Sequence, residues 1–196
     1  FEIMPRIGVE FVLRHVPNSH DPLSTIYPWY VLMELTSGGD EAALRETIEA
    51  VLAEGMEQDL VQDAVIAQSE AQRAAFWRMR ETMSEAQKPE GGSIKCDVSV
   101  PVSLMAEFIE RASAAQAALC PGIRHVTFGH IGDGNVHFND IAHELGGSIS
   151  AEHGVGRMKI HELPRYKSAV ELDIMRTLKR TFDPNNILNP GKVVEV

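Results

Sequence analysis

Two histidines flank a glycine-rich turn in the segment GHIGDGNVHFN, residues 129–139. The Gly-Asp-Gly at 132–134 is a strong turn signal between two β-like stretches, because glycine adopts positive φ and aspartate bonds to its own backbone. A hairpin at this turn would fold His130 back toward His137. Two converging imidazoles are half of a divalent-metal site, and an oxygen ligand would complete it while leaving a position for substrate.

The oxygen ligand that the sequence offers lies in GGSISAEHGVGRMK, residues 146–159, where Glu152 and His153 are adjacent. The two glycines that follow allow the backbone to turn sharply. Adjacent residues usually point in different directions, so with Glu152 on the metal, His153 would flank the open position as a general base. Spacing alone favours structural hydrogen bonding over metal binding for these histidines, so the pattern needs independent support.

The composition excludes several classes of partner. The 196 residues are 44% hydrophobic and 23% charged, which is typical of a globular protein. With 18 basic and 28 acidic residues the net charge is -10, which argues against nucleic acid and anionic membranes and leaves small molecules as partners. No apolar run approaches the roughly 20 residues that span a bilayer. Cys96 and Cys120 match no CxxC spacing, so we expect free thiols and a cytoplasmic location.

Strands that alternate with helices must position the candidate site residues. We expect a first helix over 1–15. In 93–101 every second residue is apolar, so Lys95 points away from the core. Arg80 and Ser84 are four apart on an expected helix and therefore share a face. The further helices are expected over 40–55, 69–88 and 102–119, and the strands over 28–37, 60–67, 93–101 and 123–131.

The order of these elements predicts an α+β fold. We expect an open, mainly antiparallel sheet covered by helices, as in a ferredoxin-like cap, followed by a helical C-terminal segment. Residues 1–139 would form the substrate or cap domain. Residues 140–196 would carry the metal carboxylate and the tail.

Three segments together resemble a known family. GHIGDGNVHFN, SAEHGVGRMK and FDPNNILNPGKV (182–193) follow one another as in the C-terminal half of the FAD-linked 2-hydroxyacid dehydrogenases, the group of D-2-hydroxyglutarate dehydrogenase, D-lactate dehydrogenases and the glycolate oxidase flavin subunit. FWRMRETMSEA (76–86) and IKCDVSVPV (94–102) extend the resemblance over nearly the whole chain. The resemblance implies that a preceding domain, absent from this chain, binds most of the FAD.

Matched position by position, the resemblance implies a divalent-metal site in this half. The implied ligands are His130, His137 and Glu152, while Asn139 and His153 fall on substrate-contacting positions, with His153 as the base. Two imidazoles and a carboxylate suit zinc, although manganese, iron and cobalt also bind such sets.

The resemblance also assigns three residues to the substrate carboxylates. These are Arg80, Ser84 and Lys95, with Ser84 standing where relatives carry threonine. A guanidinium grips a carboxylate by two parallel hydrogen bonds and an ammonium adds a point charge, which suits a small anionic acid. Taken alone, each charge would more often be a solvated surface residue. Asn189, in ILNPGK, matches a position near the flavin ring.

The implied activity is metal-assisted oxidation of a D-2-hydroxy acid to the 2-oxo acid, with hydride passing to FAD. The substrate would be D-2-hydroxyglutarate or D-lactate, and the isolated chain would be inactive. Two cations exceed what the single carboxylate of lactate requires, which favours a dicarboxylate. The alternatives are a metal-dependent hydrolase and a non-catalytic ligand-binding or dimerisation module, for which the tail 182–193 has no evident use.

The sequence also gives expectations about the partners of the chain and about the segment that follows Asn139. The resemblance implies the chain's own N-terminal FAD domain as a partner. The electron acceptor is not identified, and a homodimer is left open. Asn139 is followed directly by DIAHELGGSIS, where relatives carry a longer stretch. The chain is either shorter there or lacks residues between Asn139 and Asp140, and the short path from His137 to Glu152 favours missing residues.

Overall fold

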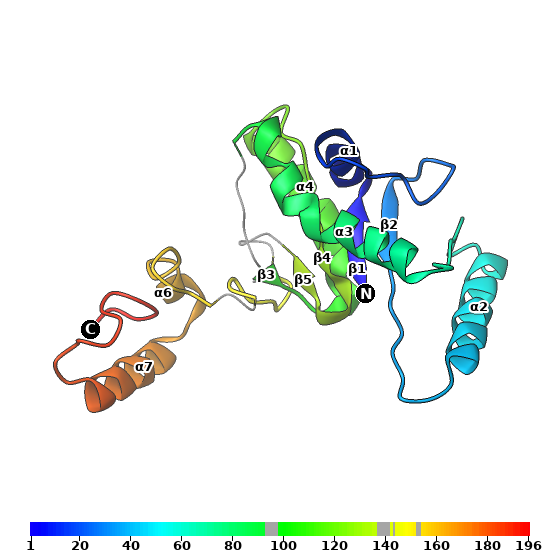
Figure 1. The fold of residues 1–196 in the computed structure, drawn as a ribbon. Helices are drawn as coiled ribbons and strands as arrows, with labels where there is room; N and C mark the ends of the chain where they lie inside the picture. Colours follow the sequence, from blue (N-terminus) through cyan, green and yellow to red (C-terminus); the bar gives the residue numbers. More distant parts are fainter. Residues whose placement is uncertain (93–97, 137–141, 143, 152–153) are drawn as a thin grey trace. The chain divides into compact units, whose positions relative to one another are not determined.

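The computed structural model describes the chain apart from residues 93–97, 137–141, 143 and 152–153 (Figure 1). The chain forms two compact units, Phe1–Ile94 with Arg124–His130, and Lys95–Ile123 with Ile131–Val196. These ranges differ from the division at residue 139 expected from the sequence, which stays a prediction. No helix in the described part is both long and apolar enough to cross a membrane.

The first unit is built on a three-stranded antiparallel sheet. Its strands are β1 (Glu2–Pro5), β2 (Trp29–Leu32) and β4 (Gly129–His130), in the order β2-β1-β4. The central strand β1 is buried along its whole length. Its register places Met4 opposite Tyr30 of β2 and Glu2 opposite His130 of β4. The sheet therefore brings together two residues that are 128 positions apart in sequence.

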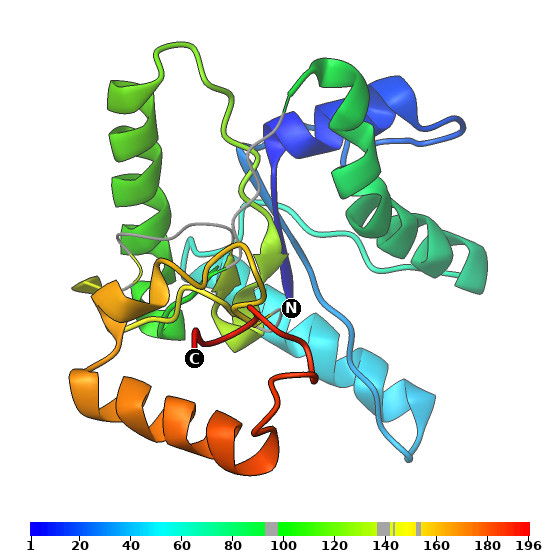
Figure 2. The same cartoon turned by 90° about the vertical axis from the view of Figure 1, so that its left-hand side faces the viewer.

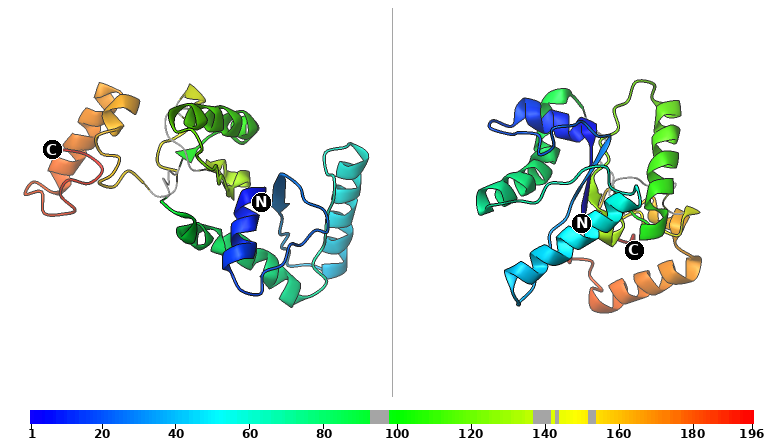
Figure 3. Two further views of the ribbon diagram at one scale, coloured as in Figure 1. Left: turned by 90° about the horizontal axis from the view of Figure 1, so that it is seen from above. Right: turned by 90° about the vertical axis from the view of Figure 1, so that its right-hand side faces the viewer.

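Two helices supply the core against this sheet. They are α1 (Arg6–His15) and α3 (Glu70–Ala86), which lie side by side (Figure 3). Their apolar spacing is helical, and the residues that it selects are buried. The core shared by the sheet and the two helices contains Met4, Val9, Phe11, Val12, Tyr30, Met79, Met83, Ala86 and Phe128.

Side chains cap two helices of this unit. Asp40 caps α2 (Glu41–Glu57) by accepting a hydrogen bond from the Ala42 amide at 3.1 Å. Ser69 caps α3 by accepting from the Gln72 amide at 3.3 Å. Both side chains satisfy an amide that the first turn of a helix leaves unpaired. A short 3-10 helix, η1 (Lys88–Glu90), follows α3.

Three predictions for this unit were wrong in part. Residues 1–15 do not form one helix, because 2–5 are strand β1 and the helix begins at Arg6. A short apolar run fits a buried strand as well as a buried helix, and only the neighbouring strands decide between them. Residues 60–67 form no strand, and in 123–131 only Gly129 and His130 are in a ladder.

The second unit carries a two-stranded antiparallel sheet and most of the C-terminal helices. Strand β3 (Val98–Ser99) pairs with β5 (Asn135–Val136). The expected alternation holds where it is described, since Val98 and Val100 are buried and Ser99 is half-buried. The helices are η2 (Val102–Leu104), α4 (Met105–Leu119), η3 (Ile131–Asp133), α6 (Leu163–Tyr166) and α7 (Ala169–Phe182). The α+β class and the helical C-terminal segment are thus confirmed.

The hairpin predicted around residues 132–134 was wrong. Strand β4 before the turn pairs with β1, and β5 after it pairs with β3, so within the described residues the two strands do not pair with each other. The turn itself is present, as the 3-10 turn η3 followed by Gly134 at φ +71°. Its role is to pass the chain from one unit to the other.

Candidate functional site

In the first unit, the candidate site is a cluster of three polar side chains around the buried carboxylate of Glu2. Glu2 is 5% exposed, and its two carboxylate oxygens have different partners. Oε2 accepts a hydrogen bond from Nε of Arg80 at 2.7 Å, and Oε1 lies 2.6 Å from Nδ1 of His130. Arg80 and His130 are both residues for which the sequence predicts a role, and Glu2 connects them.

The sheet and α3 determine where these three side chains meet. Glu2 and His130 are directly opposite on neighbouring antiparallel strands, where Cβ atoms approach within about 5 Å. Glu2 shares a face of β1 with Met4, which packs in the same core as Met79 and Met83 of α3. Arg80 follows Met79 on that helix. Its guanidinium also lies over the ring of Phe128, 4.8 Å from the ring centroid.

Two groups of the cluster have atoms that do not contact Glu2, namely Nε2 of His130 and the terminal nitrogens of Arg80. His130 is 43% exposed at its side chain, and its Nδ1 faces Glu2, so Nε2 is the nitrogen that a metal could use. A metal-bound histidine typically gives its other ring nitrogen to a carboxylate in this way, so His130 fits a ligand position. Arg80 contacts Glu2 through Nε alone, and among the described residues its terminal nitrogens make no hydrogen bond. Ser84, half-buried, lies one turn further along the same face of α3.

In the second unit, considered by itself, three backbone segments meet at Ser99. Ser99 of β3 pairs with Asn135 of β5 and also with Ser148. The Ser99 amide donates to the Ser148 carbonyl at 2.9 Å, and the Ser148 amide donates to the Ser99 carbonyl at 2.8 Å. The described residues that lie together here are therefore close in sequence to the predicted site residues Lys95, His137, Asn139, Glu152 and His153, which are themselves outside the described residues.

The loop after Ser148 turns as the sequence predicts. Gly154 and Gly156 both have left-handed backbones, with φ of +72° and +56°. The Gly156 carbonyl accepts a hydrogen bond from the Val193 amide at 3.0 Å. This bond attaches the end of the C-terminal tail to the loop that carries the predicted metal carboxylate in its sequence.

The C-terminal tail forms a compact turn after α7 (Figure 2). Buried Asp183 ends the helix, and its two oxygens accept from the amides of Ile187 at 2.9 Å and Leu188 at 2.8 Å. The ion pair with Lys179, together with these amides, holds the pKa of the Asp183 carboxyl below its usual value. Ile187 and Leu188 expose most of their apolar surface, and Asn189 beside them is exposed with φ of +48°.

Four of the nine predicted site residues lie in the described part of the chain. They are Arg80, Ser84, His130 and Asn189. The other five lie outside the described residues, and they are Lys95, His137, Asn139, Glu152 and His153. Among the described residues alone, no group of three or more His, Cys, Asp or Glu side chains could hold a metal ion. Cys120 is a free, exposed thiol, and Cys96 is outside the description.

Sequence reasoning missed Glu2. The signal that could have found it is a single carboxylate at the start of an apolar run, FEIMP, because a charge that must be buried requires partners.

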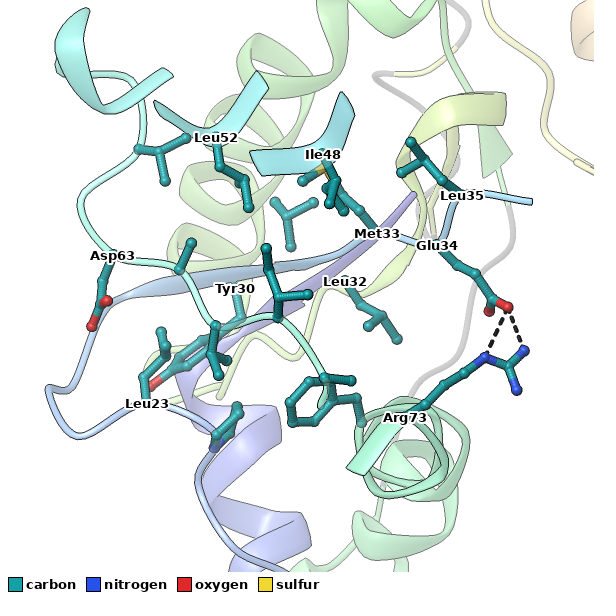
Figure 4. Close-up of a pocket in the computed structure, with 18 of the residues that line it drawn as sticks. Leu23, Tyr30, Leu32, Met33, Glu34, Leu35, Ile48, Leu52, Asp63 and Arg73 are labelled. Carbon is teal, nitrogen blue, oxygen red and sulfur yellow. Dashed lines mark hydrogen bonds and ion pairs between the residues drawn. The ribbon is translucent and has the colours of Figure 1, made fainter. Parts of the chain in front are cut away.

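A cavity of the first unit lies away from this cluster. It has a volume of about 550 Å³ and is lined mostly by apolar residues, among them Leu32, Ile48, Leu52 and Phe76 (Figure 4). Glu34 at its edge is already occupied, since it accepts hydrogen bonds from Arg73 and from the indole nitrogen of Trp77. Neither Arg80 nor His130 lines the cavity, whose lining includes residues of α2 and β2.

Comparison with known proteins places the chain in a family. The family described as FAD linked oxidases, C-terminal domain, matches residues 1–141 and 138–193. A probable mitochondrial D-2-hydroxyglutarate dehydrogenase of Oryza sativa subsp. indica is 36% identical over 214 residues, which cover 99% of this chain and 38% of the relative. The mitochondrial D-2-hydroxyglutarate dehydrogenase of Arabidopsis thaliana is 37% identical over 213 residues, which cover 99% of this chain and 37% of that relative. The D-2-hydroxyglutarate dehydrogenase of Xanthomonas citri pv. viticola is 37% identical over 221 residues, which cover 100% of this chain and 45% of that relative.

Two features of these matches concern the extent of the chain. The chain spans less than half the length of these relatives. The alignments are longer than the 196 residues of the chain, so the relatives carry residues that this chain does not have. The family match is also divided into two segments at 138–141, which is where the sequence departs from the family pattern. With residues 1–193 matched in these two segments, the chain belongs to the family of FAD-linked oxidases, as a C-terminal domain of that family.

Proposed function

We propose that this chain is the substrate- and metal-binding half of an FAD-dependent dehydrogenase that oxidises D-2-hydroxyglutarate to the 2-oxo acid. The observation that supports the proposal is the Arg80–Glu2–His130 cluster, in which one carboxylate contacts a guanidinium and Nδ1 of an imidazole. Family membership supports FAD as the cofactor. The names of the relatives support D-2-hydroxyglutarate as the substrate.

In this proposal, cationic residues of the chain select the acid. The terminal nitrogens of Arg80 bind the distal carboxylate of the substrate by two parallel hydrogen bonds. Ser84, one turn away, donates a third hydrogen bond, and Lys95 adds a positive charge. Two cations match a dicarboxylate better than the single carboxylate of D-lactate, so D-lactate is the less favoured substrate.

The reacting end of the substrate lies at the histidines. Nε2 of His130, with His137 and Glu152, holds the metal, and Asn139 contacts the substrate. When bound, the metal supplies Lewis-acid polarisation of the substrate hydroxyl, and the flavin, near Asn189, supplies the hydride acceptor. His153 accepts the hydroxyl proton while the hydrogen on C2 leaves as hydride for the flavin. The C–O bond becomes C=O, and the substrate loses a hydride and a proton, which together are two electrons and two protons.

The test uses the longer protein that contains this chain and its flavin domain. We expect turnover of D-2-hydroxyglutarate with an artificial electron acceptor, a lower kcat/KM for D-lactate, and about one divalent metal per chain. His153→Asn should lower kcat by roughly 10² to 10⁴, the usual contribution of a general base. His161→Asn is the matched control, because His161 is exposed and pairs with Glu195.

Two results would contradict the proposal. Full activity of His153→Asn would exclude the base, and undiminished metal content in His137→Ala would exclude the ligand set. A metal-dependent hydrolase would show hydrolytic turnover without flavin reduction. Bleaching of the flavin absorbance by D-2-hydroxyglutarate, in the absence of an acceptor, distinguishes the two reaction classes.

A further inference from the structure

The buried carboxylate of Glu2 is not explained by the stability of the fold. It lies in the central strand of the sheet, where its neighbours Ile3 and Met4 are buried and apolar. Well-packed apolar residues in place of a buried ion pair are often neutral or stabilising, because charges lose their hydration on burial. A glutamate at this position therefore indicates a task that an apolar residue could not perform.

The partners of Glu2 indicate that task. A carboxylate accepts hydrogen bonds and donates none, so the hydrogen between Glu2 and His130 belongs to Nδ1 of the imidazole. In the neutral ring Nε2 then carries the lone pair that a metal requires. The second oxygen of Glu2 accepts from Nε of Arg80, which fixes one edge of the guanidinium while the ring of Phe128 supports its plane.

We propose that Glu2 is a positioning residue that orients both groups of the site, the metal-binding tautomer of His130 and the carboxylate-binding fork of Arg80. The proposal rests on the proposed function of those two residues. One carboxylate thereby fixes the distance between the metal and the distal end of the substrate. Both bonds come from one rigid element, because β1 is paired on each side, by β2 and by β4.

The isosteric variant Glu2→Gln separates this role from packing. Its amide keeps the volume of the side chain but has one acceptor oxygen and a donor NH₂. If the amide oxygen accepts from Arg80, the NH₂ faces Nδ1 of His130. The imidazole must then change to the Nε2–H tautomer, in which Nε2 has no lone pair for a metal. If the oxygen serves His130, the NH₂ faces Nε of Arg80, and the guanidinium is displaced.

The experiment measures zinc affinity and steady-state kinetics of the flavin-loaded longer protein. Zinc affinity is determined by competition with a colorimetric chelator, and it does not depend on turnover. If the amide oxygen accepts from Arg80, we expect Glu2→Gln to bind zinc roughly 10- to 100-fold more weakly, the usual effect of losing such a partner of a metal ligand, and added zinc should restore much of kcat. If the oxygen accepts from His130, zinc affinity should be kept, and KM for D-2-hydroxyglutarate should be about tenfold higher because Arg80 is no longer held.

Glu10→Gln is the matched control. Glu10 also accepts from Nε of an arginine, Arg6, at 2.9 Å, and it lies in the same unit outside the site. Its variant should keep zinc affinity and KM. An equal loss in both variants, or unchanged zinc affinity and KM in Glu2→Gln, would overturn the role of Glu2. Absence of both zinc binding and turnover in the unaltered protein would instead overturn the proposed function, and with it the ligand role of His130.

A second measurement decides the matter if Glu2→Gln does not fold. Nitrogen NMR of the unaltered, metal-free protein, labelled at histidine and held at a pH where imidazole is neutral, reports which ring nitrogen of His130 carries the hydrogen. The His130 signal is identified by its loss in His130→Gln. The Nδ1–H form is expected, and an Nε2–H form would overturn the proposal.

Discussion

Gly134 lies against the backbone of Val100 so closely that no side chain fits between them. The Val100 amide donates to the Gly134 carbonyl at 2.9 Å. A Cβ atom added to Gly134 would lie 2.0 Å from the Val100 carbonyl oxygen, and the φ of Gly134 is +71°. The glycine therefore permits both a left-handed turn and the close approach that starts the pairing of β5 with β3.

Replacement of this glycine should strongly destabilise the second unit. Gly134→Ala must both move the Val100 backbone and strain φ, and we expect a loss of more than about 1 kcal/mol in the free energy of unfolding, measured by urea denaturation. Gly38→Ala is the control, because a Cβ at Gly38 meets nothing within 4 Å. A Gly134→Ala protein as stable as the control would show that the turn does not require glycine.

Arg80→Lys should impair substrate binding although it preserves the charge. Lysine offers no planar fork and no Nε, so it cannot contact Glu2 and the substrate carboxylate together. A hydrogen bond to a charged group is worth about 1.5 to 3 kcal/mol, so kcat/KM of the longer protein for D-2-hydroxyglutarate should fall roughly 10- to 150-fold. Arg78→Lys, on the same helix but bonded to the Pro17 carbonyl, should leave it unchanged. A similar fall in both variants would point to damage of α3 instead.

Glu90 should make the stability of the first unit sensitive to acid. Arg124 first, then His15 and Arg14, hydrogen bond to this carboxylate and lower its pKa from 4.5 to about 2. Between these values the unfolded chain binds the proton and the folded chain does not, so stability falls as pH falls. The contribution of Glu90 is complete above pH 4.5 and disappears as pH approaches 2.

The measurement for Glu90 is a series of urea denaturations between neutral pH and about pH 2, the folded-state pKa. Glu90→Gln should be less stable than the unaltered protein at neutral pH, and the difference should shrink in the acid range. Glu49→Gln removes an exposed ion pair with Arg45 and should show only a small effect. A difference for Glu90→Gln that stays constant over the whole range would refute the assignment.

Asp183→Asn should loosen the C-terminal turn. The amide replaces one acceptor oxygen by a donor, so one of the amides of Ile187 and Leu188 loses its partner, and Lys179 loses its ion pair. Hydrogen exchange at these two amides should accelerate, measured by NMR or mass spectrometry. Asp173→Asn, exposed on the same helix, should leave both rates unchanged. Retained protection at both amides would show that Asp183 does not hold the turn.

Local patterns were sufficient to predict most of the helices and the class of the fold. The helices expected over 40–55, 69–88 and 102–119 are present as α2, α3 and α4, with only small differences at their ends. These features depend on contacts within a few residues, so the sequence contains them directly. The same reasoning placed Arg80 and Ser84 on one face of α3.

The pairing of strands was decided only by the tertiary structure. Residues 2–5 are a strand because β2 and β4 hydrogen bond to them, and the turn at 132–134 connects two sheets instead of closing a hairpin. Long-range pairing is invisible in a local pattern, since a short apolar run suits either a strand or a helix. Motif and resemblance thus sufficed to name His130 and Arg80, but only the folded sheet revealed that Glu2, 128 residues before His130, joins them.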